Sequence, residues 1–89
     1  MAILIHPDGT EEHVTPINGK RYSLKEMQKH VGGLIQQIPR TPTSVRMFVN
    51  EEGLLLRLPL NVSAMIRVRK WYPNSLVGRA LLLEKGERF

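Results

Sequence analysis

The segment from Tyr22 to Gly33 constrains the fold more than any other, because it contains the start, the apolar face and the end of one helix. The Ser23 hydroxyl is suited to accept a hydrogen bond from an amide of the first turn, and Glu26 stands where it completes a capping box. Gly32 ends the helix, since glycine adopts the left-handed C-terminal conformation without a side-chain clash. The apolar stripe consists of Leu24, Met27 and Val31.

The residues on either side of this helix predict strands. Residues 2–6 form an apolar run, a Pro7-Asp8-Gly9 turn follows, and residues 11–15 alternate in polarity, which predicts a β-hairpin. After the helix, residues 34–38 and 44–50 predict two more strands. In the second of them, one side carries Val45, Met47 and Val49, and the other carries Arg46 and Phe48.

The second half of the chain predicts one more helix and one more strand. Residues 50–53 are typical of a type I turn, whereas residues 54–60 fit a strand, a single helical turn or a buried arm. Asn61 is the expected N-cap of a helix that runs to about Lys70, and residues 76–84 predict a last, central strand. The apolar stripe of this helix would be Val62, Met65 and Ile66. We expect an α+β fold, a mainly antiparallel sheet (β-β-α-β-β-α-β) with two short helices on one face.

Composition narrows the protein class. The 89 residues favour one domain over residues 1–89, with a frayed tail at residues 85–89. Cysteine is absent, which excludes disulfides and thiolate metal sites. No signal sequence or membrane span is indicated, so we expect a cytoplasmic protein. The formal net charge of +5 favours anionic partners, although a basic surface also serves solubility alone.

The densest functional signal is the segment from Arg67 to Tyr72, which places cations beside two large aromatic side chains. Arginine binds phosphate through paired hydrogen bonds, and an aromatic face stacks on a base. The alternative is structural: Trp71 closes the core, and the cations interact with the carboxyl end of the helix. The candidate ligand-binding residues are Arg46, Arg67, Arg69, Lys70, Trp71 and Tyr72, where Arg46 takes part only if the fold brings it near.

Other chemistry has weaker support. If the first hairpin pairs His6 with Glu11, then His13 joins them on one face as a two-histidine, one-carboxylate cluster, but histidines on a short strand are more often ordinary surface residues. His30 is placed to interact with the end of the first helix. No serine lies in a nucleophile elbow, and no glycine-rich phosphate loop precedes a helix. We assign no catalytic residue, no metal and no cofactor.

The segment from Tyr22 to Ile35 resembles an uncharacterised family of small domains from bacteriophages and plasmids, with the pattern Y-S-L-x-E-[ML]-Q-x-x-V-G-G-x-I. Further matches lie at Met47–Asn61 and Leu76–Gly78, and the resemblance covers most of the chain after residue 20. It brings no catalytic motif. It implies an accessory protein of a mobile element, acting inside a bacterial cell.

Together, the resemblance and the charge predict a non-enzymatic binding protein, a counter-defence or host-takeover factor that sequesters an anionic ligand such as a nucleotide signal. One alternative is nucleic-acid binding through the segment from Arg67 to Tyr72, which would weaken steeply with salt. Another is a protein-interaction inhibitor of a host enzyme. The expected partners are therefore a nucleotide, a nucleic acid or a host protein, with no membrane, and a homo-oligomer is compatible with each.

Overall fold

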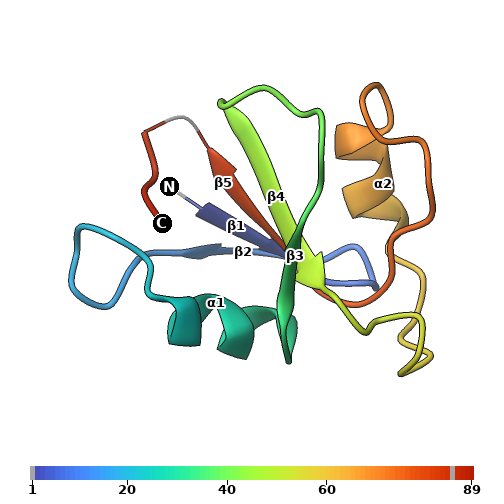
Figure 1. Ribbon diagram of the computed structural model, residues 1–89, viewed down its shortest axis with the longest axis horizontal. Coiled ribbons are helices and arrows are strands. Elements are labelled where there is room, and N and C mark those ends of the chain that lie inside the picture. The colour runs from blue at the N-terminus through green and yellow to red at the C-terminus, as the bar shows by residue number, and fades with distance from the viewer. Residues whose placement is uncertain (1, 85) are drawn as a thin grey trace.

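A computed structural model describes residues 2–84 and 86–89 of the chain. A five-stranded antiparallel sheet has the order β2-β1-β5-β4-β3. Its strands are β1 (Ala2–Ile5), β2 (Glu11–Val14), β3 (Ile35–Gln37), β4 (Val45–Asn50) and β5 (Ala80–Glu84), and its helices are α1 (Leu24–Val31) and α2 (Val62–Val68). The predicted α+β fold is confirmed, and β5 lies at the centre of the sheet (Figure 1).

The cap residues of α1 act as the sequence predicts. The Ser23 hydroxyl accepts a hydrogen bond from the Glu26 amide at 3.2 Å, and the Glu26 carboxylate accepts one from the Ser23 amide at 2.7 Å. Gly32 ends the helix with φ of 83° and donates its amide to the Gln28 carbonyl at 2.8 Å. Met27 and Val31 are buried, but Leu24 is half exposed because it begins the helix away from the sheet.

The two helices cover opposite faces of the sheet, which corrects the expectation of two helices on one face. Met27 and Val31 of α1 pack with one set of strand residues, Ala2, Leu4, Phe48, Leu81 and Leu83. Ala64 and Val68 of α2 pack with the alternate set, Ile3, Ile5, Met47, Val49, Ala80 and Leu82. The strands are apolar on both sides, so both faces need a cover. Figure 1 shows α1 and α2 well apart, on different sides of the strands.

The face of α2 that packs on the sheet matches the predicted stripe only at Met65, which is partly buried against the core. Ala64 and Val68 are fully buried, whereas Val62 and Ile66 are 52% and 57% exposed. Asn61 determines this orientation: its side chain accepts the Ala64 amide at 3.0 Å and donates to the Ile5 and Gly78 carbonyls at 2.9 and 2.8 Å. The predicted N-cap therefore also joins α2 to β1 and to the segment before β5.

Two segments outside the helices and strands have defined positions, the turns at residues 51–57 and the C-terminal residues 86–89. Residues 51–57 form turns, and Leu54 and Leu55 are 76% and 81% exposed, so this part is not a buried arm. Near the C-terminus, the Arg88 carbonyl accepts the Tyr22 amide at 2.9 Å, and the Phe89 ring lies edge-on to Phe48 at 5.5 Å. Residues 86–89 thus contact the sheet, and Lys85 lies outside the described residues. In the described part of the chain, neither helix is long and apolar enough to cross a membrane.

Candidate anion-binding groove

The structure separates the arginines of the predicted binding segment. Arg67 on α2 makes two hydrogen bonds to the Glu11 carboxylate, at 3.0 and 2.8 Å, so its charge already has a partner. Arg46 on β4 donates to the Glu87 carbonyl. Since Arg46 alternates with Met47, which packs under α2, its side chain leaves the sheet on the face that α1 covers. Arg46 and Arg67 therefore do not converge on one site.

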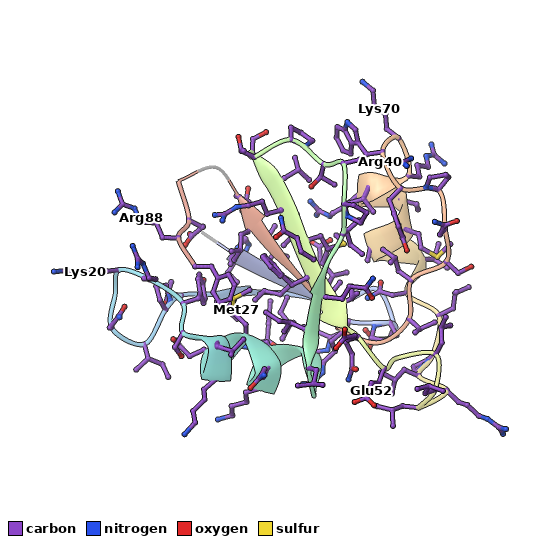
Figure 2. The ribbon with its side chains drawn as sticks, in the orientation of Figure 1. Lys20, Met27, Arg40, Glu52, Lys70 and Arg88 are labelled. Atoms are coloured by element: carbon purple, nitrogen blue, oxygen red, sulfur yellow. The ribbon has the colours of Figure 1, made fainter. Side chains whose placement is uncertain are left out.

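The other residues of that segment remain near the end of α2. Trp71 and Tyr72 are half-buried and pack against the core under α2, while Arg69 and Lys70 are exposed. The Lys70 ammonium lies 5.9 Å from the centre of the Trp71 ring, and Figure 2 shows Lys70 pointing away from the body of the molecule. Trp71 thus closes the core in part and remains accessible in part.

The conditional histidine cluster is not formed, because the hairpin has a different register. Ile5 pairs with Glu11, and Ile3 pairs with His13. Because both isoleucines face α2, Glu11 and His13 lie on the α2 face as well. His6 instead contacts Glu12 on the α1 face, at 2.9 Å. Within residues 2–84 and 86–89, no group of three histidine, cysteine or carboxylate side chains is placed to hold a metal ion.

A different cation is free on the α1 face. Arg79 lies directly before β5, in step with Leu81 and Leu83, so its side chain extends from the sheet toward α1. It is half-buried, and no acidic side chain in the described part of the chain pairs with it. Guanidinium has five N–H donors, and removing such a group from water without a partner costs free energy. Arg79 is therefore the cation best placed to attract an anion.

Arg79 lines two hollows, and we call the two together the groove. One, of about 370 Å³, is lined by Leu4, Glu12, Val14, Thr15, Ile17, Glu26, Lys29, His30 and Arg79. The other, of about 280 Å³, is lined by Pro7, Val31, Gly32, Asn50, Leu56, Leu58, Pro59, Gly78 and Arg79. We call the first the polar hollow and the second the apolar hollow, and Arg79 belongs to both.

The position of Arg79 depends on Gly32, on Gly78 and on one backbone hydrogen bond. A Cβ at Gly32 would lie 3.0 Å from an Nη atom of Arg79, so glycine lets the guanidinium approach the carboxyl end of α1, whose dipole favours a cation. The Gly78 amide donates to the Pro59 carbonyl at 2.8 Å, and a Cβ at Gly78 would lie 2.7 Å from Leu58. The chain is thus held on both sides of the arginine.

The polar hollow is lined by two cations and two carboxylates, so its formal charges balance, but only the carboxylates are engaged by other groups. The Glu26 carboxylate accepts hydrogen bonds from the Ile17 and Ser23 amides at 2.6 and 2.7 Å, and the Glu12 carboxylate is hydrogen-bonded to His6. Lys29 and Arg79 have no such partner among the described residues. These two cations from α1 and the start of β5 face the same space, so an anion there can contact both.

His30 adds a titratable group to the polar hollow. Burial lowers the pKa of His30 from its ordinary value of 6.5, the Glu12 and Glu26 carboxylates oppose this shift, and the Arg79 and Lys29 cations reinforce it. A bound anion would favour the protonated imidazole, because it offsets the repulsion from those cations. The hollow can therefore gain a third positive charge when it is occupied.

The sequence itself contains a signal for Arg79. This residue precedes a mostly apolar strand, and the alternation of that strand places it on the side of Leu81 and Leu83. A cation at this position indicates a charge directed over one face of the sheet. Its proximity to His30 and Lys29 depends on how α1 lies across that face and has no sequence signal.

Comparison with known proteins agrees with the expectation of a domain of unknown function. No curated protein and no solved structure shows significant similarity to the chain. A family profile described as a domain of unknown function, DUF3846, matches residues 1–89. Because this match covers every residue, the chain belongs to the family of the domain of unknown function DUF3846.

Proposed function

We propose that this protein is a non-enzymatic binding protein that holds a small phosphate-bearing anion, such as a nucleotide, in the groove at Arg79. One observation carries the proposal: Arg79, a half-buried residue, has no acidic partner in the described part of the chain and lines both hollows. Charge-assisted hydrogen bonds from arginine to phosphate are among the strongest polar contacts in proteins. An occupant would therefore compensate the desolvation of Arg79.

The same contacts favour binding over catalysis. General acid–base chemistry needs a carboxylate or imidazole within reach of the substrate and free to exchange a proton. Both carboxylates of the polar hollow are engaged, Glu26 by two backbone amides and Glu12 by His6. The groove thus offers cations to hold an anion and only His30 to exchange a proton.

The test is a titration of the protein with inorganic phosphate and with pyrophosphate at low ionic strength, followed by calorimetry and by NMR. We expect saturable binding, with the largest shifts at Arg79, Lys29 and His30. Replacing Arg79 by Gln should weaken binding at least tenfold, because a charge-assisted contact contributes about 1.5–3 kcal/mol. The matched control is Arg69→Gln, which removes the same charge from an exposed position at the end of α2.

The control variant also tests the second candidate function, nucleic-acid binding at the end of α2. The observation that favours this candidate is the stacking of Lys70 over Trp71 beside the exposed Arg69. If a single-stranded oligonucleotide binds and Arg69→Gln weakens it while Arg79→Gln does not, the α2 end is the binding surface and the groove proposal is wrong. Absence of heat with phosphate, pyrophosphate and nucleotides would also reject the groove.

The wider role that we propose is sequestration of such an anion on behalf of a mobile element. The resemblance to phage and plasmid domains supports this setting. The groove supports only the binding step, and the calorimetric test above addresses that step alone.

A further inference from the structure

We infer that the ligand of the groove is a phosphate monoester with a small apolar body, and that the apolar hollow selects this body by size and not by hydrogen bonding. The inference rests on the proposed function, because it takes Arg79 as the phosphate contact. It assigns the phosphate to the polar hollow and the attached ring or short chain to the apolar hollow.

The lining of the apolar hollow supports an apolar occupant. Leu56, Leu58, Pro59, Pro7 and Val31 supply aliphatic surface around it, and Arg79 is its charged lining residue. Its volume of about 280 Å³ is near the lower end of the range for small-molecule pockets. Leu56 is still 56% exposed, so a ring placed against it would remove further apolar surface from water. A bare phosphate ion would leave this apolar lining exposed to water.

The amide of Asn50 does not provide hydrogen-bond selectivity in this hollow. Its Nδ2 atom donates to the Val31 carbonyl at 3.3 Å, and its Oδ1 atom accepts the Glu52 amide at 2.8 Å. Asn50 is only 5% exposed, and no side-chain hydroxyl is among the lining residues. Because its one side-chain amide is nearly buried, the hollow offers few side-chain hydrogen bonds with which to distinguish one base from another by its edge pattern.

Arg79 lines both hollows, so one residue borders the space assigned to the phosphate and the space assigned to the apolar body. A phosphate bound to Arg79 therefore lies next to the apolar hollow. The guanidinium packs closely against Gly32 at the end of α1, where a Cβ would lie 3.0 Å from an Nη atom, so a side chain at this position would displace it. A molecule with phosphate and ring directly connected brings its two groups to these neighbouring spaces.

The experiment compares the affinities of inorganic phosphate, phenyl phosphate, CMP and UMP for the whole protein by calorimetry. Phenyl phosphate should bind about tenfold more tightly than phosphate, as expected for burial of roughly two methylene equivalents. CMP and UMP have bases of the same size with different hydrogen-bonding edges, so both should exceed phosphate and should differ from each other by less than about threefold. Leu56→Asn should remove the gain of phenyl phosphate over phosphate, because it takes apolar surface away from the ring.

The matched control is Leu55→Asn, which makes the same change at the neighbouring residue, 81% exposed and outside the lining of the hollow. It should retain the full gain. If phosphate binds at Arg79 but phenyl phosphate binds no better, or if both variants behave alike, the inference fails and the proposed function stands. A strong preference for one of the two nucleotides overturns selection by size. If phosphate does not bind, the proposed function itself fails.

Discussion

At the scale of single residues, the functional value of a charge in this protein depends on its neighbours and not on its type. Arg67 and Arg79 are both arginines next to apolar residues in the sequence. Arg67 has its charge matched by Glu11 across the α2 face, whereas Arg79 meets a glycine at the end of α1 and an open groove. A salt bridge between exposed groups contributes little to stability, but it removes Arg67 from competition for a ligand.

Asn61 is the residue on which the connection between α2 and the sheet depends most. Its fully buried side chain makes three hydrogen bonds, to Ile5, Gly78 and Ala64. Replacing Asn61 by Ala leaves these backbone groups buried without partners, and we expect a loss of about 3–5 kcal/mol in the free energy of unfolding, measured by urea denaturation.

Two further variants show which hydrogen bonds of Asn61 account for the loss of stability. Asn61→Asp keeps the oxygen that caps the Ala64 amide but cannot donate to the carbonyls of Ile5 and Gly78, so it should also destabilise strongly. Asn74→Ala, at an exposed position, should change stability by less than about 0.5 kcal/mol. An Asp variant as stable as the parent would show that the cap matters and that the two carbonyl contacts do not.

Gly78 and Gly19 allow backbone strain and side-chain crowding to be separated. Both have φ of 76°, but a Cβ at Gly78 would lie 2.7 Å from Leu58, whereas a Cβ at Gly19 meets nothing within 4 Å. Gly19→Ala should cost about 1 kcal/mol of stability for the left-handed conformation alone. Gly78→Ala should cost about 1–3 kcal/mol more, because Leu58 must move. Equal losses in thermal denaturation would contradict the crowding.

At the scale of elements, α1 is held in place by its first turn. The Glu26 carboxylate accepts the Ile17 and Ser23 amides, so it connects the helix to the preceding loop as well as closing the capping box. These hydrogen bonds, that from Ile17 first, lower the pKa of Glu26 below its ordinary value of 4.5. The charged carboxylate therefore stabilises the start of the helix that carries Lys29 and His30.

This shift predicts a pH dependence of stability. Because the folded-state pKa of Glu26 is lowered, its contribution is present above pH 4.5 and is lost as the pH falls through the lowered value. Glu26→Gln keeps an acceptor oxygen but does not titrate, so its urea midpoint should be lower at neutral pH and should fall less on acidification. Glu52→Gln, at an exposed turn position, should retain the acid dependence of the parent.

At the scale of the whole molecule, the groove exists only because segments far apart in the sequence meet beside the sheet. Glu12 comes from β2, Glu26, Lys29 and His30 come from α1, and Arg79 precedes β5. The apolar side is completed by Pro7, Leu56, Leu58 and Pro59. Binding at this place should therefore couple to the protonation of His30, which faces all of these charged groups.

Sulfate provides the test, because it remains a dianion over the pH range, at and below 6.5, in which the His30 imidazole takes up a proton. In the free protein the pKa of His30 lies below 6.5, so lowering the pH through this range destabilises the fold, since the unfolded chain takes up the proton first. Bound sulfate should raise the pKa of His30, and sulfate affinity should increase as the pH falls. NMR of the imidazole signals follows both effects, and adding sulfate at constant pH should leave the signals of His13, on the α2 face, in place. An unchanged His30 titration would place sulfate elsewhere.

Much of the fold could be predicted because its signals are local. The Ser23 and Glu26 caps, Gly32 and the Asn61 cap depend on residues a few positions apart, and the alternation of Val45 to Val49 fixes which side chains share a face. The buried side of α2 could not be predicted in the same way. Its orientation depends on the contacts of Asn61 with Ile5 and Gly78, which are distant in the chain.

The sequence alone determined the elements, their order and the basic charge. Capping and strand alternation depend on residues that are close in the sequence, and the net charge depends on composition alone. Tertiary structure decided which cations remain free for a ligand. The hairpin register brought Glu11 to Arg67 and Glu12 to His6, and the placement of α1 left Arg79 beside Gly32, Lys29 and His30. Charges interact through space, so their pairing is fixed only when segments far apart in the sequence pack together.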